Sequence, residues 1–318
     1  MNANRRRFLT TTSMALAAAA AGRSALFARV SQSAGAGQAG PPAAPPTAFA
    51  ALRGTIGTFV GQGGTIGYHI GKDGVVVVDA QMAPTAQIAL QGIRERAGGR
   101  MIDVLVNTHH HGDHTEGNAV FRPAVKRILA HVNVPSLQRA AAAQQAAARP
   151  GAPPPEPVVA DATFVNTWEE DVGGERLALK YYGAAHTSGD AVVTFAKTDV
   201  VHMGDLVFNR RHPYIDRPAG ASISNWIKVL EAVAGEHGSD TQYIFGHAGE
   251  RFPVTGARAD LLYQRDYLTA LLEHVRRELT AGKPKDEIVK TAAALRGFPD
   301  HGPLVPRVLT AAYEELAG

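Results

Sequence analysis

The residues best suited to do chemistry form one run, residues 107–114, with the sequence NTHHHGDH. Side chains two apart on an extended segment point the same way, so His109 and His111 are expected to hold one metal ion while His110 faces elsewhere. Asp113 and His114 follow directly, after a turn. Four candidate ligands within six residues do not converge easily on one tetrahedral ion. The spacing therefore favours two adjacent metal ions.

Three further candidate ligands lie far along the chain: His186, Asp205 and His247. His186 lies in a loop between two expected strands, Asp205 ends another strand, and His247 directly follows a fourth. Strand ends and the loops after them present their side chains at one edge of a sheet. We therefore expect all three to meet the run at residues 107–114. The remaining histidines that lie in expected strands or next to the run are expected to pack or to support the ligands: His69, His110, His131 and His202.

The elements that must position these side chains alternate between strands and helices. A meander of strands over residues 55–79 ends in the apolar run Val75–Val78, a helix is expected over residues 84–96, and a strand over 101–106 leads into the histidines. Strand, helix and strand in this order indicate a βαβ unit with functional residues at a strand end. The second half repeats the theme, with strands at residues 176–183, 191–195, 200–203 and 243–245 and a helix at 223–234. The sequence thus predicts two packed sheets between helical layers, an α+β fold.

Two further segments lie outside these strands. From Gly256 onward the chain is mostly helical, and a stripe of leucines predicts packing on the core, with a partner-binding helix as the alternative. Between residues 135 and 157 an Ala/Gln/Pro-rich stretch is expected to be helical in its first part only. It is either a lid near the site or a passive surface insertion.

The N-terminus resembles a twin-arginine export signal, because paired arginines and one spacer precede Phe8 and Leu9. The apolar run that follows, residues 14–21, is too short to span a membrane. We expect a signal peptide at residues 1–36, a flexible Pro-rich linker at 37–50 and a periplasmic location. A disordered basic tail is the alternative.

Composition excludes several classes of function. Five of the 32 Lys and Arg residues lie in the first 45 residues, which hold no acidic side chain, so the rest of the chain carries 27 basic against 29 acidic residues, a net charge of −2. That balance gives no positive field to attract nucleic acid. The absence of cysteine excludes disulfides, a thiolate nucleophile and sulfur ligands. A metal ion must therefore be held by histidines and carboxylates.

The motifs occur in an order that resembles the metallo-β-lactamase superfamily. They are His-x-His-x-Asp-His at 109–114, Gly-x-x-His-Thr-x-Gly-Asp at 183–190, Gly204-Asp205 and Gly246-His247. The ligand set resembles that of the glyoxalase II type, and the similarity covers roughly residues 55–250. The resemblance implies a four-layered αββα sandwich with metal ions at one edge between the sheets. On this basis we expect a catalytic domain at residues 51–254 and a helical C-terminal extension at 255–318 packed on it.

The resemblance also implies roles for the candidate ligands. The first metal ion is held by His109, His111 and His186, the second by Asp113, His114 and His247, and Asp205 bridges the two. Such ligands fit two Zn²⁺ ions, and iron or manganese can replace zinc in one position. The pair lowers the pKa of a shared water to about 7, and the hydroxide so formed attacks an acyl carbon. Asp113 is expected to orient this hydroxide, and Thr187, Ser188 or Asp190 to fix the imidazole tautomers.

The sequence says less about the substrate. In sulfur-ligated β-lactamases of this fold, the position of Asp205 is Cys, and a Lys three residues later binds the substrate carboxylate; here that residue is Phe208. Arg210, Arg211 and His212 are an alternative anion-binding group, unless they are only solvated charges. We expect a small-molecule substrate with an acyl bond in a β-lactam, lactone or thioester. The oligomeric state stays open.

Three rival functions are weaker. A metal-dependent phosphodiesterase or nuclease conflicts with the net charge of −2. A di-iron oxygen- or nitric-oxide-reducing module would need a carboxylate in place of His111. A non-catalytic metal-binding protein conflicts with seven intact candidate ligands.

Overall fold

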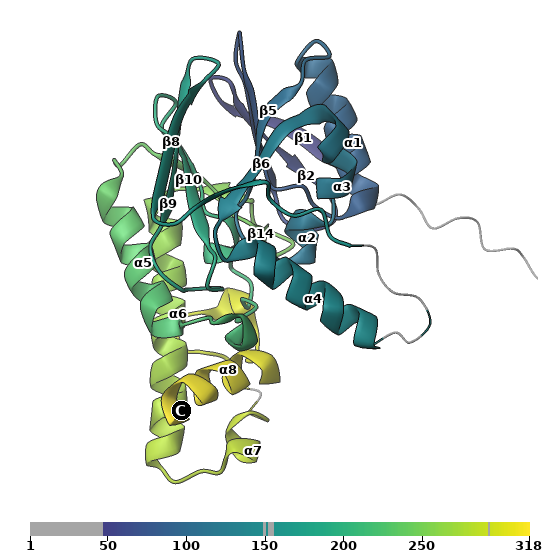
Figure 1. Ribbon diagram of the computed structural model, residues 1–318. Coiled ribbons are helices and arrows are strands. Elements are labelled where there is room, and N and C mark those ends of the chain that lie inside the picture. The colour runs from purple at the N-terminus through teal and green to yellow at the C-terminus, as the bar shows by residue number, and fades with distance from the viewer. Residues whose placement is uncertain (1–46, 149–150, 152–155, 292) are drawn as a thin grey trace, which may run out of the picture. The chain divides into compact units, whose positions relative to one another are not determined.

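The computed structural model describes residues 47–148, 151, 156–291 and 293–318, and their strands form two main sheets (Figure 1). The first sheet has seven strands in sequential order: β1 (Ala48–Arg53), β2 (Ile56–Val60), β3 (Ile66–Ile70), β4 (Val75–Val78), β5 (Ile102–Asn107), β6 (Val125–His131) and β7 (Ala162–Phe164). The second sheet has six strands in the order β15 (Thr255–Gly256), β13 (Gln242–Ile244), β11 (Val200–His202), β10 (Ala191–Phe195), β9 (Glu175–Tyr181) and β8 (Thr167–Val172). A separate short pair consists of β12 (Phe208–Asn209) and β14 (His247–Ala248).

The helices cover the outer faces of the two sheets (Figure 1). On the first sheet lie α1 (Ala83–Arg96) and α3 (Asn118–Phe121), and nearby are the short α2 (Gly112–Thr115) and the longer α4 (Val134–Ala148). On the second sheet lie α5 (Ile223–Glu236) and α6 (Arg258–Thr280), and α7 (Lys285–Ile288) and α8 (Pro306–Ala317) pack against α6. One-turn 3₁₀ helices occur at Arg122–Ala124, Gly204–Leu206, Arg217–Ala219 and Pro299–His301. Among the described residues, no helix combines the length and the apolar character that a membrane span requires.

The apolar run of β4 explains how the layers stack. Its side chains alternate between the two faces of the sheet, so that Val75 and Val77 pack with α1. Val76 and Val78 instead pack against the second sheet, together with residues such as Val193. All four valines are fully buried. A strand that is apolar on both faces therefore requires cover on both, which gives the αββα order predicted from the sequence.

The βαβ unit predicted around the histidine run is confirmed. β4 and β5 are parallel neighbours, and α1 connects them. α1 ends at Arg96, and Gly98 and Gly99 follow with φ of 66° and 80°. Left-handed backbone of this kind suits glycine, which has no side chain to clash. The strand that follows delivers the chain to the start of the histidine run.

The structure adds detail to two predicted segments, the N-terminal linker and the Ala/Gln-rich stretch. The predicted signal peptide, residues 1–36, lies outside the described residues, as does most of the predicted linker. Residues 48–50 of that linker lie in β1, because Phe49 packs against Phe59 with ring centroids 4.6 Å apart. The Ala/Gln-rich stretch after His131 forms α4, which extends away from the sheets and buries only Val134 and Gln138 (Figure 1).

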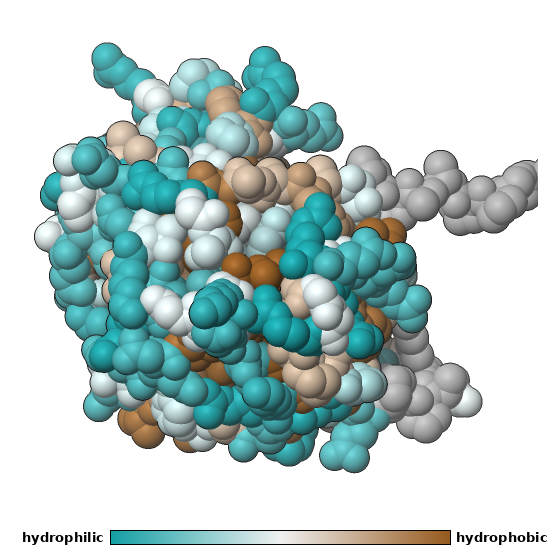
Figure 2. Space-filling view, turned by 90° about the horizontal axis from the view of Figure 1, so that it is seen from above, coloured by the Kyte–Doolittle hydropathy of each residue, from teal (hydrophilic) through white to brown (hydrophobic). Residues whose placement is uncertain are grey.

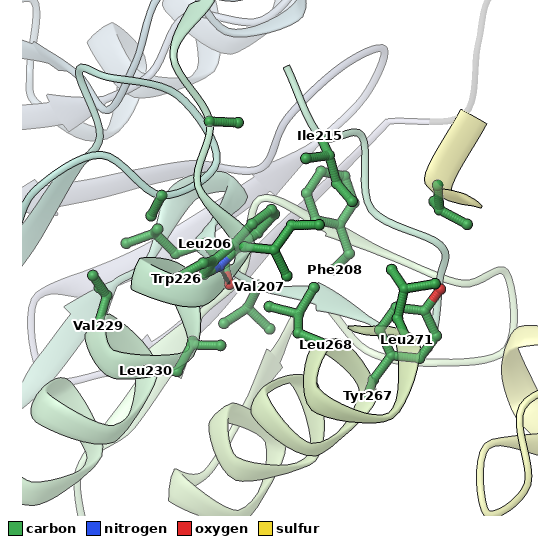
Figure 3. Packing of buried hydrophobic residues seen from close by; sticks show 14 of the residues in the cluster. Leu206, Val207, Phe208, Ile215, Trp226, Val229, Leu230, Tyr267, Leu268 and Leu271 are labelled. Carbon is green, nitrogen blue, oxygen red and sulfur yellow. Dashed lines mark hydrogen bonds between the residues drawn. The ribbon is translucent and has the colours of Figure 1, made fainter. Parts of the chain in front are cut away.

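The C-terminal helices are part of the core. The apolar stripe predicted for the tail is buried, with Leu261, Leu268 and Leu271 fully inaccessible. Figure 3 shows how α6 and α5 enclose the chain that follows β11: Leu206, Val207 and Phe208 lie among Trp226, Val229, Leu230, Tyr267, Leu268 and Leu271. The outer surface is largely hydrophilic on the face seen in Figure 2, where apolar residues form small separate patches. The stripe is thus used for core packing.

Candidate metal centre

Four segments bring the predicted ligands to one place at the edge between the sheets. The run at residues 109–114 occupies the bend after β5 and the short helix α2. His186 lies in the loop between β9 and β10, Asp205 in the 3₁₀ helix after β11, and His247 at the start of β14. His109 and His111 lie beyond the strand rather than in it, so the bend and not strand alternation makes their side chains converge. His110 lies beside them, with its ring centroid 4.4 Å from that of His111.

The first group consists of His109, His111, His186 and Asp205, whose ligand atoms all lie within 4.8 Å of one another. The Nδ1 atom of His111 lies 3.0 Å from His109 Nε2 and 3.0 Å from His186 Nε2. Asp205 Oδ2 lies 3.8 Å from His109 Nε2 and 3.5 Å from His186 Nε2. Three nitrogens and one carboxylate oxygen therefore face a common point.

The ring nitrogens that point away from the group determine whether the nitrogens that point into it, the inner ones, carry a proton or a lone pair. His111 Nε2 lies 2.8 Å from an Asp216 carboxylate oxygen, and His186 Nδ1 lies 2.8 Å from the carbonyl oxygen of Tyr214. Both partners only accept hydrogen bonds, so each outer nitrogen carries the proton and each inner nitrogen carries a lone pair. Lone pairs 3.0 Å apart repel each other unless a cation lies between them. The arrangement thus fits a metal ion better than a hydrogen-bond network.

The same logic applies to His109. The Thr108 hydroxyl donates to Asp79, so it accepts a hydrogen bond from His109 Nδ1 at 3.0 Å. The Nε2 atom of His109, which faces the group, is then left with its lone pair. Burial lowers the pKa of His109 well below its usual value and that of His186 to about 3, which keeps both imidazoles neutral. Neutral imidazole is the form that binds metal ions.

The second group consists of Asp113, His114 and His247. His247 Nε2 lies 3.1 Å from Asp113 Oδ2 and 3.4 Å from His114 Nε2. Asp205 also faces this group, with Oδ1 3.0 Å from His114 Nε2 and Oδ2 3.4 Å from His247 Nε2. Asp205 therefore touches both groups and joins them into one centre.

The electrostatics of the centre favour cations. Burial on its own would raise the pKa values of Asp113 and Asp205, but His247 and His114 lower them, to about 2 for Asp113 and well below the usual value for Asp205. Conversely, burial opposes protonation of His247, yet Asp205 and the hydrogen bond to Asp113 raise its pKa to about 9. Two ionised carboxylates, the buried Asp205 and the partly exposed Asp113, thus share the centre with histidines. Positive charge, from protons or from metal ions, has to compensate them.

Asp79, which was not among the predicted site residues, contacts Thr108 and His114 at this centre. It is fully buried and has a positive φ of 65°, directly after the valines of β4. Its carboxylate accepts hydrogen bonds from the backbone N–H and the hydroxyl of Thr108, and Oδ2 lies 2.7 Å from His114 Nδ1. A carboxylate directly after a fully apolar strand was the signal in the sequence that marks it.

Asp216 is the second support that sequence reasoning missed. Its carboxylate accepts a hydrogen bond from His111 Nε2 and lies 3.6 Å from His110 Nε2. Asp216 also precedes and caps the 3₁₀ helix Arg217–Ala219. Nothing near it in the sequence resembles a motif. The hydroxyl and backbone N–H of Thr187 bond instead to Asp190, so these two stabilise their own loop rather than fixing an imidazole tautomer.

The centre opens into a cavity of about 270 Å³. Its lining consists of His111, Gly112, Asp113, Asp205, Phe208, Arg211, His212, Tyr214, His247 and Arg307. Of the three residues predicted to bind an anion, Arg211 and His212 line the cavity and Arg210 does not. Arg210 forms an ion pair with Asp260 and lies over the ring of Tyr263.

Comparison with known proteins agrees with this geometry. Residues 63–272, more than half of the chain, match the metallo-beta-lactamase superfamily, and the chain therefore belongs to it. Its clustered His and Asp side chains are positioned so that they could hold metal ions. A comparison with curated proteins finds no match.

Solved structures show the same fold. The sec-alkylsulfatase Pisa1 from Pseudomonas sp. aligns with a TM-score of 0.66 and 18% identity over 86% of this chain, and this chain spans about half, 50%, of its length. A metallo-beta-lactamase from Pontibacter korlensis aligns with a TM-score of 0.57 and 18% identity over 70% of this chain and 99% of that one. One from Hirschia baltica aligns with a TM-score of 0.55 and 16% identity over 70% and 98%.

Proposed function

We propose that this protein is an exported, dinuclear zinc hydrolase that cleaves an acyl bond in a small substrate. The observation that carries the proposal is Asp205, whose two oxygens face both ligand groups at 3.0 to 3.8 Å. A carboxylate shared in this way suits two adjacent cations. Histidine and carboxylate ligands without sulfur fit zinc, and also iron or manganese in one position.

The ligand roles follow the two groups. His109, His111 and His186 would hold one ion, Asp113, His114 and His247 the other, and Asp205 would lie between them. When bound, such ions supply Lewis-acid activation of water and of the scissile carbonyl group. The side chain of Asp113 is 31% exposed, compared with 4% for Asp205. Asp113 is therefore the carboxylate that could orient an attacking water, while Asp205 would hold the centre together.

The substrate is proposed to be a β-lactam, a lactone or a thioester. Two of the similar structures are metallo-beta-lactamases by name, which supports the first of these. The N-terminal sequence RRRFL supports export by the twin-arginine route to the periplasm. Replacing Arg5 and Arg6 by Lys should retain the protein in the cytoplasm, as measured by cell fractionation; unchanged export would refute this route.

The hydrolase proposal is tested by metal analysis and a substrate panel. Purified wild-type protein should carry two zinc ions per chain and hydrolyse at least one of nitrocefin, an acyl-homoserine lactone and a glutathione thioester. His111→Ala should lose zinc and turnover while keeping its circular dichroism spectrum. His237→Ala, which changes a histidine at the end of α5 away from the centre, is the matched control and should retain both. Normal turnover by His111→Ala would refute the mechanism.

A further inference from the structure

The arginines in and around the cavity differ in whether a carboxylate neutralises their charge. Arg210 pairs with Asp260, and Arg217 pairs with Glu315 at 3.1 Å. Arg211 and Arg307 line the cavity itself. Among the described residues, neither of these two guanidinium groups forms an ion pair with a carboxylate. Two uncompensated positive charges thus share a cavity with the metal centre.

Arg307 belongs to the C-terminal extension and is held in place. It lies in the first turn of α8, and its Nη2 atom donates to the carbonyl oxygen of His212 at 3.1 Å. His212 is fixed in turn, because its two ring nitrogens contact the Tyr267 hydroxyl at 2.7 Å and the Pro303 carbonyl oxygen at 2.9 Å. The extension therefore anchors the chain segment that carries Arg211 and adds a second arginine to the lining of the cavity.

From this arrangement we infer that Arg211 and Arg307 form an anion-binding subsite for a carboxylate of the substrate. Guanidinium groups bind carboxylates through paired, charge-assisted hydrogen bonds. The same cavity of about 270 Å³ is lined by Asp113 and His247 of the metal centre. The inference rests on the proposed function and narrows its substrate to anionic acyl compounds. β-Lactams and glutathione thioesters carry a carboxylate, whereas an acyl-homoserine lactone does not.

The subsite is tested by binding, without turnover. Glutarate, with two carboxylates, can contact both the metal ions and the arginines, whereas monomethyl glutarate has one carboxylate only. Isothermal titration of the zinc-loaded protein should show glutarate binding about tenfold more tightly, a difference of about 1.4 kcal/mol. Arg307→Met and Arg211→Met should each reduce that ratio several-fold, and Arg307→Lys should fall between Arg307→Met and wild type. Sulfate should compete weakly with glutarate; sulfate that competes as well as glutarate would overturn the carboxylate assignment.

Two control variants each remove the charge of an arginine that lies outside the cavity lining. Arg276→Met removes an exposed arginine of α6 that lies at another surface and should leave the ratio unchanged. Arg265→Met removes another arginine of α6, whose charge is paired with Asp266 away from the cavity lining, so it should also preserve the ratio. Equal glutarate affinity in wild type, Arg211→Met and Arg307→Met would overturn the subsite.

Failure of the subsite and failure of the proposed function give different results. If wild type hydrolyses no acyl substrate but prefers glutarate in an arginine-dependent manner, the hydrolase proposal fails and the subsite stands. If wild type hydrolyses nitrocefin and its neutral methyl ester with equal kcat/KM, and the arginine variants do likewise, the subsite fails and the hydrolase stands. With both correct, Arg307→Met raises KM for nitrocefin about tenfold with little change in kcat.

Discussion

Four imidazoles of the centre are held in place by hydrogen bonds from their outer nitrogens. The hydrogen-bond partner is Thr108 for His109, Asp216 for His111, Asp79 for His114 and the Tyr214 carbonyl oxygen for His186. Each contact fixes a tautomer and a ring direction before any ion arrives. The ligand geometry is therefore a property of the folded chain.

Asp216 offers the cleanest test of this support at the scale of a single residue. Asp216→Ala removes the acceptor of His111 Nε2, so zinc affinity is expected to fall about 10- to 100-fold. Asp216→Asn keeps a hydrogen-bond acceptor without the negative charge, so its zinc affinity should lie between those of Asp216→Ala and wild type. Chelator competition measures the affinity. Asp300→Asn, an exposed aspartate distant in sequence, is the control, and an unchanged zinc affinity in Asp216→Ala would contradict the assigned role.

Gly246 tests how closely the backbone packs around Asp205. A Cβ at this position would overlap Asp205 Oδ1 and come within 2.7 Å of the Gly204 backbone. Gly246→Ala is therefore expected to displace Asp205, to lower the affinity for both zinc ions and to reduce thermal stability. Gly235→Ala in α5 meets no atom within 4 Å and should be stabilising, by up to about 1 kcal/mol. Zinc titration and thermal melting of both variants measure these effects. Equal zinc affinity and equal melting temperature in the two variants would count against close packing at Gly246.

At the residue scale, the sequence predicted what motifs encode and missed what only the fold brings together. The spacing of the run at residues 109–114 indicates metal ligands, so its meeting with His186 and His247 could be predicted. Asp216 and Arg307 lie 105 and 196 positions after His111 on the chain, and no local pattern marks them. Their proximity depends on how a loop and a C-terminal helix pack, which spacing does not encode.

At the scale of elements, β4 and β5 were predictable because burial on both faces leaves a continuous apolar run. The bend after β5 was not, since the histidines continue the strand pattern in sequence but leave the strand in space. α4 has the composition of a helix, yet it is anchored only near its first turn. Whether it moves over the cavity stays a prediction open to test.

The 3₁₀ helix Pro299–His301, which lies between α7 and α8 in the chain, yields a prediction about pH. His301 is buried between aromatic rings, with its ring centroid 4.1 Å from that of Tyr267, and neither ring nitrogen has a protein partner among the described residues. Burial lowers its pKa from 6.5 to about 3, so the folded state binds this proton less readily than the unfolded state. Its contribution therefore destabilises the fold progressively as pH falls below 6.5 towards 3.

His301→Phe removes the titrating group and keeps an aromatic ring in the stack. The melting temperature of the variant should consequently fall less than that of wild type between about pH 7 and about pH 5. At about pH 7 the variant should be at least as stable as wild type, because an unpaired buried polar group has been replaced. Parallel pH dependences for the two proteins would show that His301 does not titrate in the fold.

At the scale of the whole molecule, the C-terminal extension joins the fold instead of being appended to it. The superfamily match ends at residue 272, inside α6, although α6 continues to Thr280. The described residues, from 47 onward, form one compact unit. The same core cluster contains Val201 of the second sheet, Trp226 of α5 and Leu309 of α8. Sequence similarity thus extends past the boundary expected between residues 254 and 255 and ends inside α6, before the folded unit does.

Deleting α8 tests this integration. Val308 and Leu309 are fully buried, and losing each costs about 1.5–3 kcal/mol of apolar burial, together about 3–6 kcal/mol. That is a large part of the about 5–15 kcal/mol that stabilises a typical domain. A chain ending at residue 304 should therefore melt at a much lower temperature, or fail to fold, whereas Arg307→Met should melt like wild type. Deleting the predicted signal, residues 1–36, is the control and should not change the melting temperature. A chain ending at residue 304 with unaltered stability would mean that α8 rests on a core complete without it, and the C-terminal extension would then serve the cavity alone.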